Sequence, residues 1–148
     1  MAAESVQAIE PMTSSEIVNR YFSAYETQDR PVVEDLLTDD FTFTSPNDEH
    51  IDKAVYFERC WQFSHLNPTF RFVKLVESGG DVFVLYECTP KDGATFRNTE
   101  FFQIGDGKIK AIEVYFGSLP TSGKEDSPMQ HYETLKLPKM PKVPKTRK

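Results

Sequence analysis

The sequence places helical patterns mainly in its first half and strand patterns in its second. Apolar residues recur at helical spacing over residues 14–28, and shorter helical segments are predicted over residues 29–40 and 52–64. Alternating or apolar segments predict strands over residues 41–44, 69–77, 81–89, 94–104 and 108–117. Because the helices come first and a run of strands follows, the order indicates an α+β fold and not an alternating α/β fold.

Local signals predict where several of these elements begin or turn. Thr13 and Glu16 have the spacing of a capping box at the start of the first helix. Asp29 can cap the second helix, and Pro31 suits its first turn. The glycines on either side of Asp106 predict a tight hairpin between the last two strands.

Charge is distributed unevenly along the chain. The tail from Lys136 to Lys148 carries six basic residues and no acids, whereas the remaining chain carries 11 basic and 23 acidic residues. The prolines of the tail recur every third residue, which favours polyproline II over a helix. We therefore expect an unstructured N-terminus (1–12), a folded domain (13–118) and a flexible tail (119–148).

Two interpretations of the basic tail remain open: it adds solubility, or it makes weak contacts with an acidic surface. The acidic body is a poor surface for nucleic acid, because binding there depends on neutralising phosphates. We expect no nucleic-acid partner.

The sequence shows no pattern typical of a membrane protein, a secreted protein or a metal site. The N-terminus lacks the basic and apolar regions of a secretory signal, and no apolar run approaches the ~20 residues that span a bilayer. The three histidines lack ligand spacing, and Cys60 and Cys88 are far apart, which favours packing roles in a reducing compartment. We expect a cytoplasmic protein without metal, cofactor or membrane partner.

Three acids interrupt the predicted apolar strands: Glu87, Glu100 and Glu113. An acid on the outer face of a sheet is solvated or lies in an interface. On the inner face it is desolvated, which raises its pKa and suits it to donate or transfer a proton. Pairing with Arg97 or Asn98 is the structural alternative for Glu100.

Two stretches, residues 16–46 and 96–117, resemble the nuclear transport factor two superfamily, most closely its SnoaL-like and ketosteroid isomerase-related bacterial proteins. The strings DDFTFTSP and GDGKIKAIEVYFG carry most of this resemblance. It implies a cone-shaped, curved antiparallel sheet packed against three N-terminal helices, with a small-molecule pocket inside. It also implies a homodimer through the convex sheet face, where Glu113 and Tyr115 would point outward.

The resemblance further implies a set of site residues. Ketosteroid isomerases use a helix-1 tyrosine and a protonated strand acid as an oxyanion hole, and an aspartate before a proline as the base. Tyr21 and Glu100 match the first two positions, but Ser45 stands at the third and cannot abstract a carbon-bound proton at neutral pH. Asp48 or His50 would replace it only if their loop folds inward. The implied ligand-binding residues are Phe43, Ser45, Tyr56, Trp61, Phe83, Leu85, Glu87, Asn98 and Phe102.

Two functions remain open from the sequence. The first is an isomerase, cyclase or lyase that acts on a small hydrophobic carbonyl compound, with Tyr21 and Glu100 as hydrogen-bond donors. The second is a non-catalytic ligand-binding or dimeric adaptor module, which the serine at position 45 favours.

Overall fold

A computed structural model describes residues 11–117 of the 148-residue chain. The predicted tail, and all but two residues of the predicted N-terminal segment, lie outside this range. The elements follow in the order α1 (Ser14–Thr27), α2 (Arg30–Leu36), β1 (Leu37–Ser45), β2 (Asp48–Asp52), α3 (Lys53–Arg59), the 3₁₀ helix η2 (Trp61–Leu66), β3 (Thr69–Ser78), β4 (Asp81–Thr89), β5 (Phe96–Gly105) and β6 (Lys108–Phe116).

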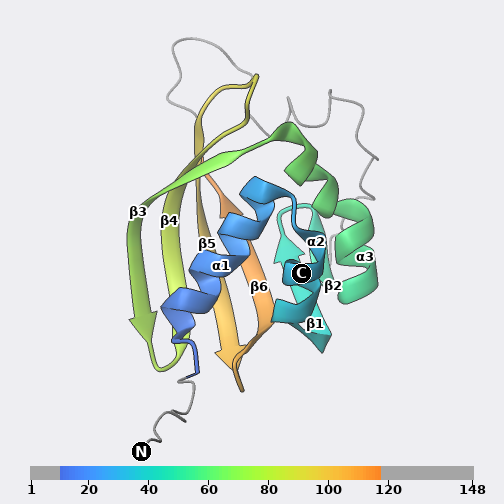
Figure 1. Cartoon of the computed structure of the whole chain (residues 1–148), viewed down its shortest axis with the longest axis vertical. Coiled ribbons are helices and arrows are strands. Elements are labelled where there is room, and N and C mark those ends of the chain that lie inside the picture. The colour runs from blue at the N-terminus through green and yellow to red at the C-terminus, as the bar shows by residue number, and fades with distance from the viewer. Residues whose placement is uncertain (1–10, 118–148) are drawn as a thin grey trace, which may run out of the picture.

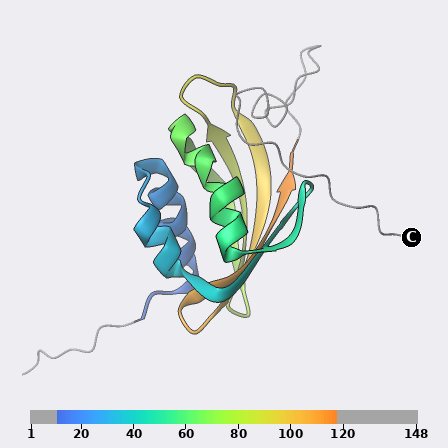
Figure 2. The ribbon, with the colours of Figure 1, turned by 90° about the vertical axis from the view of Figure 1, so that its right-hand side faces the viewer.

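The six strands form one curved sheet in the order β2-β1-β6-β5-β4-β3 (Figure 1). The helices lie on one side of this sheet, so the predicted α+β fold is confirmed (Figure 2). Neighbouring strands are antiparallel except for β1 and β6, which run parallel. The curved sheet is thus antiparallel apart from this one pair, and β2 occupies residues for which no strand was predicted.

The first helix begins with the predicted capping box. The Thr13 hydroxyl accepts a hydrogen bond from the Glu16 amide at 3.1 Å, and the Thr13 amide donates to the Glu16 carboxylate at 2.9 Å. Asp29 precedes α2 as predicted but makes no capping hydrogen bond. No helix within residues 11–117 has the length and apolar character needed to cross a bilayer.

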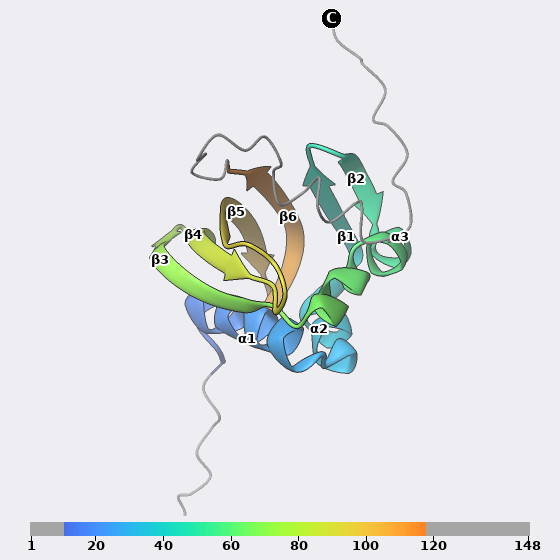
Figure 3. The same ribbon diagram turned by 90° about the horizontal axis from the view of Figure 1, so that it is seen from above.

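The core lies between α1 and the inner face of the sheet, which is the face toward the helices. Seen from above, the strands curve over α1, while α3 lies beside β1 and β2 (Figure 3). Phe22 of α1 makes edge-to-face contacts with Phe70, Phe72, Tyr86 and Phe102, at centroid separations of 4.8 to 5.8 Å. Aromatic packing therefore fixes this helix across the sheet.

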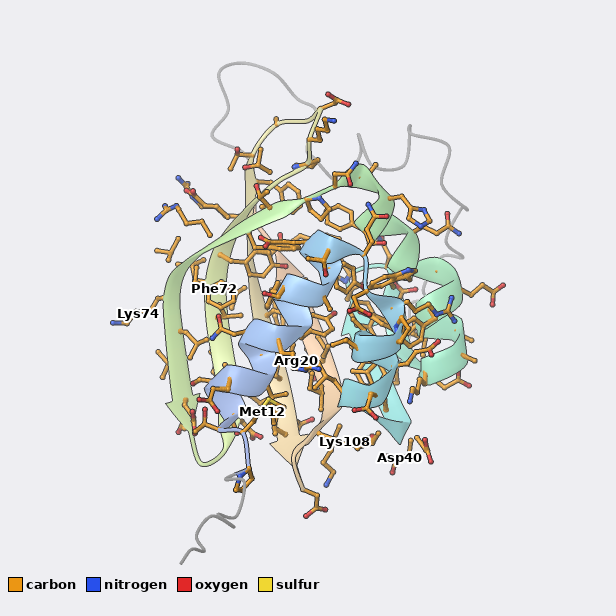
Figure 4. All side chains as sticks on the ribbon, viewed as in Figure 1. Met12, Arg20, Asp40, Phe72, Lys74 and Lys108 are labelled. Atoms are coloured by element: carbon orange, nitrogen blue, oxygen red, sulfur yellow. The ribbon has the colours of Figure 1, made fainter. Side chains whose placement is uncertain are left out.

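Strand β3 contains a bulge that changes which side chains face inward. The pairing of β3 with β4 shifts register between Phe72 and Lys74. Phe72 points toward α1 and Lys74 points away from it (Figure 4). Beyond the bulge Leu75 is the half-buried residue, whereas strict alternation from Phe72 would have placed Lys74 inside.

The predicted hairpin between β5 and β6 is present. Asp106 and Gly107 both have positive φ, at 56° and 76°. Such a pair of left-handed residues matches the twist of antiparallel strands. The turn pairs Gly105 with Lys108, and a register shift between Gln103 and Ile104 then carries Glu100 opposite Val114.

The core assignment predicts a large loss of stability on truncation of Phe102, whose side chain is fully buried against Tyr21 and Phe22. Phe102→Ala should lower the free energy of unfolding by about 3–5 kcal/mol, because it leaves a cavity in the aromatic core. Urea denaturation measures this change. The exposed neighbour Gln103 provides the control, since Gln103→Ala should change stability by no more than about 0.5 kcal/mol.

Candidate functional site

A cavity of about 110 Å³ lies between the helices and the inner face of the sheet. Its wall is mainly aromatic, with polar groups from α1, α3 and strands β1, β2, β4 and β5. The lining residues are Tyr21, Phe22, Tyr25, Phe43, Ser45, Asn47, Asp48, Tyr56, Cys60, Phe63, Phe70, Tyr86, Cys88, Phe96, Asn98, Glu100, Val114 and Phe116. An apolar pocket with a few polar groups is the usual form of a small-molecule site.

Three tyrosine hydroxyls meet at one side of the cavity. Tyr21 and Tyr25 from α1 each place a hydroxyl 2.5 Å from the hydroxyl of Tyr56 on α3. Burial raises the pKa of all three phenols well above the ordinary value, so they remain neutral at physiological pH. Two contacts use two of the three hydroxyl protons. The Tyr21 and Tyr25 hydroxyls also interact with each other, so the three hydroxyls form one hydrogen-bonded cluster on the cavity wall.

A second polar group is centred on Glu100 of β5. The Tyr86 hydroxyl donates to Glu100 Oε1 at 2.7 Å and accepts a hydrogen bond from the side-chain amide of Asn98 at 3.2 Å. The side-chain carbonyl of Asn98 accepts in turn from the backbone amide of Gly117 at 3.2 Å. This sequence of bonds fixes Glu100 Oε1, and no protein partner within residues 11–117 binds its Oε2.

Glu100 has the environment of a proton-transfer group. Its side chain is buried, and desolvation raises the pKa of its carboxyl to about 7, although the hydrogen bond from Tyr86 opposes this change. At neutral pH the protonated form is therefore substantially populated. In that form the proton occupies the oxygen that Tyr86 does not contact, because Tyr86 already donates to Oε1.

Asp48 brings a second acid to the cavity. The turn after Ser45 folds inward, and Asp48 is only 3% exposed at the start of β2. Its carboxylate forms an ion pair with Arg59 at the end of α3 and accepts a hydrogen bond from the Ser45 hydroxyl at 3.1 Å. His50, the other residue considered in this loop, is exposed.

The two cysteines are free and both line the cavity. Burial raises the pKa of each thiol, with a further contribution from Asp48 at Cys60 and from Glu100 at Cys88. Neither thiol is ionised at neutral pH, so their environment fits packing and not nucleophilic chemistry. No group of three possible metal ligands occurs within residues 11–117.

The structure brings six of the expected site residues to the cavity wall: Tyr21, Phe43, Ser45, Tyr56, Asn98 and Glu100. Tyr21 and Glu100 share the cavity but form no direct hydrogen bond; each is bonded to another tyrosine. Phe102 packs on Tyr21 and Trp61 on Tyr25, at centroid distances of 5.3 and 4.7 Å. These two expected ligand-binding residues belong to the core around the cavity.

The expectation that Phe83, Leu85 and Glu87 point into the cavity was wrong. In β4 the inward positions are the even-numbered ones, because Val84 pairs with Glu100 and Tyr86 with Asn98. Side chains of directly paired residues lie on the same face of a sheet. Phe83 and Leu85 are therefore exposed on the outer face, where Glu87 forms ion pairs with Arg71 and Arg97.

The sequence prediction did not include two tyrosines of the site: Tyr25, whose hydroxyl bonds Tyr56, and Tyr86, whose hydroxyl bonds Glu100. Tyr25 lies one helical turn after Tyr21, and that spacing alone was sufficient to place both on one helix face. Tyr86 had no such signal, because residues 90–95 separate β4 from β5 and no short turn sets their register.

The profile of the SnoaL-like domain matches residues 18–112, which is more than half of the chain. The chain belongs to the SnoaL-like family. No curated protein sequence matches this SnoaL-like chain significantly.

Several solved structures share the fold. An NTF2-like protein from Cytophaga hutchinsonii has 22% identity and a TM-score of 0.61, over 74% of this chain and 94% of that one. The putative polyketide cyclase IdmH from Streptomyces antibioticus has 18% identity and a TM-score of 0.57, over 70% and 91%. An LEH-like epoxide hydrolase from M. tuberculosis has 16% identity and a TM-score of 0.56, over 73% and 85%. At these identities the likeness establishes the fold.

The environment of Glu100 predicts that its carboxyl titrates near pH 7. Tyr86→Phe should raise this pKa further, because it removes the hydrogen bond that stabilises the carboxylate. Carbon-detected NMR of the labelled glutamate side chains measures both values. An ordinary pKa for Glu100, or a lower one in the phenylalanine variant, would contradict the assignment.

The raised pKa of the Glu100 carboxyl also predicts how the stability of the fold depends on pH. The folded-state pKa of about 7 exceeds the value of 4.5 for a free side chain, so the folded state binds the proton more tightly. Stability should therefore fall by about 3 kcal/mol as the pH rises through this interval and then level off. Glu100→Gln should lack this contribution, which urea denaturation at several pH values can measure against wild type.

Proposed function

We propose that this SnoaL-like chain is an acid–base enzyme, an isomerase, cyclase or lyase, that acts on a small hydrophobic carbonyl compound. The observation that carries the proposal is a buried Glu100 that lines an apolar cavity and whose pKa is raised to about 7. A general acid works best when its pKa lies near the working pH. A carboxyl that served only packing would not need to face a cavity.

The tyrosine cluster and Glu100 supply complementary parts of such a site. In this proposal a hydroxyl of the Tyr21, Tyr25 and Tyr56 cluster and the protonated Glu100, which line the same cavity, donate hydrogen bonds to the bound substrate. Two donors directed at one substrate oxygen stabilise the negative charge that develops when the adjacent carbon loses a proton. The surrounding aromatic wall excludes water and strengthens this interaction.

The cavity volume limits the substrate class. An engineered cavity of ~150 Å³ in another protein binds benzene, and the cavity here is about 110 Å³. The volume therefore favours a short-chain or single-ring compound over a fused polycyclic one. The epoxide hydrolase and putative polyketide cyclase among the structural neighbours are consistent with chemistry at a substrate oxygen but do not define this substrate.

A non-catalytic ligand-binding module is the second candidate. The observation that favours it is Ser45, which stands where isomerase relatives carry the base and whose hydroxyl donates to Asp48. A module of this kind would bind a small ketone in the same cavity without converting it.

The enzyme proposal predicts turnover that depends on Glu100. The full chain should isomerise a β,γ-unsaturated cyclohexenone to its conjugated isomer, and Glu100→Gln should lower the rate by about 10²-fold or more, because glutamine cannot release a proton. Ultraviolet absorbance of the conjugated product follows the reaction, and NMR chemical-shift changes measure binding. Binding without turnover by the wild type would support the module, and an active glutamine variant would contradict the assigned role.

We also propose a homodimer formed through the outer face of the sheet. Val76, Phe83, Leu85 and Tyr115 are 45%, 47%, 37% and 58% exposed there, and Phe83 stacks on Phe101 at 4.5 Å. Contiguous exposed apolar side chains are typical of interaction sites.

The free thiols of Cys60 and Cys88 support the cytoplasm as the location of this protein.

The dimer proposal predicts that Phe83→Glu yields a monomer, because it places a charge in the centre of the apolar face. Sedimentation velocity measures the mass of each species. Lys91→Glu, on the exposed loop after β4, is the matched control and should remain dimeric. A wild-type chain that is monomeric at every concentration would overturn the proposal.

A further inference from the structure

Asp48 is a buried acid that the roles assigned to Glu100 and the tyrosines do not use. It is 3% exposed and lines the same cavity, but it comes from β2 whereas Glu100 comes from β5. Burying a carboxylate is costly unless the protein pairs it. The partners of the Asp48 carboxylate therefore bear on the role of this side chain.

Two contacts orient the Asp48 carboxylate without using all of its acceptor capacity. Arg59 forms the ion pair with Oδ1, and the Ser45 hydroxyl donates to Oδ2. The Arg59 contact is ionic, since within residues 11–117 Oδ1 has no hydrogen-bond donor of suitable geometry. A carboxylate has about four acceptor positions, so Asp48, a residue of the cavity wall, keeps acceptor capacity beyond these two contacts.

The local sequence explains why Asp48 occupies this position. The pairing of β1 with β2 shifts register between Phe43 and Ser45, and the chain then reverses over a short turn. The Asn47 amide donates to the Ser45 hydroxyl oxygen at 3.0 Å, which holds this turn closed. The carboxylate is thereby placed beside Ser45, and the serine hydroxyl serves as its hydrogen-bond donor.

A buried ion pair is weak evidence for a stabilising role, because well-packed apolar residues of similar volume often serve stability as well or better. Here the arginine side chain is 12% exposed and the aspartate side chain 1% exposed. Arg59 is absent from the residues that line the cavity, whereas Asp48 is among them. Of the two partners of this ion pair, Asp48 is the one that belongs to the cavity wall.

We propose that Asp48 is the proton acceptor of this site, held in position by Arg59 and Ser45. The inference rests on the proposed acid–base function and adds the base that position 45 does not supply. The site then has a carboxylate base on β2 and a carboxylic acid on β5. Two carboxyl groups in different environments are a common way to divide the base and acid roles.

The proton transfer is balanced within the site. Asp48 removes a proton from the carbon next to the substrate carbonyl, and the electrons of that C–H bond form a carbon–carbon double bond. The carbonyl π electrons move to oxygen, which takes the proton of Glu100. The products are an enol, neutral Asp48 and ionised Glu100. With a β,γ-unsaturated ketone the enol is a dienol, and return of the proton from Asp48 to its γ-carbon, with return of the enol proton to Glu100, gives the conjugated isomer.

Hydrogen–deuterium exchange at the carbons next to the carbonyl of cyclohexanone tests the base directly. The full chain should accelerate this exchange in D₂O, followed by proton NMR. Asp48→Asn should reduce the acceleration by about 10²-fold or more while cyclohexanone still binds, because the amide is isosteric but is not a base. Glu49→Gln, at the exposed neighbouring position, is the matched control and should exchange at the wild-type rate.

The outcomes separate this inference from the proposed function. If the wild type accelerates exchange and Glu100→Gln impairs it, but Asp48→Asn does not, the base assignment alone is overturned. If the wild type binds cyclohexanone without exchange, both proposals fail. Loss of binding together with exchange in Asp48→Asn would make Asp48 a ligand anchor and would also overturn its role as base.

An unpaired Arg59 could unfold the single variant, since removing one partner of a buried pair is strongly destabilising. The double variant Asp48→Asn, Arg59→Gln leaves neither buried charge alone. It should fold, bind cyclohexanone and lack the exchange activity. Wild-type exchange in this double variant would overturn the proposal.

Discussion

The packing of Phe22 against the sheet positions the rest of the site. One ring on α1 contacts rings from β3, β4 and β5, and each edge-to-face pair contributes about 0.5–1.5 kcal/mol beyond the area it buries. These contacts fix both the placement and the rotation of the helix. Tyr21 and Tyr25 consequently meet Tyr56 of α3, and the cavity remains open between this cluster and Glu100. A helix rotated by one residue would replace these hydroxyls by other side chains.

Three acids show how strand geometry assigns different chemistry to the same functional group. Glu87 lies on the outer face, where hydrogen bonds from Arg97 and Arg71 lower its pKa. Glu100 lies on the inner face, where no residue among 11–117 forms an ion pair with it, and desolvation raises its pKa. Asp48 is also inside but is paired with Arg59. The face of the sheet and the presence of an arginine thus distinguish an outer-face ion pair, a buried carboxyl with a raised pKa and a buried ion pair.

The sequence was informative where local chemistry determines structure and uninformative where long-range pairing does. The capping box at Thr13 and the hairpin at Asp106 each depend on adjacent residues, and both are as predicted. The face of β4 depends on its register with β5 across an intervening loop, so Phe83 was assigned to the wrong side. The short strand that begins at Asp48 exists because β1 is available to pair with it, which no local pattern indicates.

The bulge at residue 73 has a consequence for how copies of this chain meet. Strand β3 is ten residues long and forms one edge of a sheet that does not close. A long, regular edge is a template on which another strand can add and begin aggregation. The bulge interrupts this edge, and the exposed charges of Arg71, Lys74 and Glu77 lie along the same strand. These features protect the open edge against the addition of a strand from another copy.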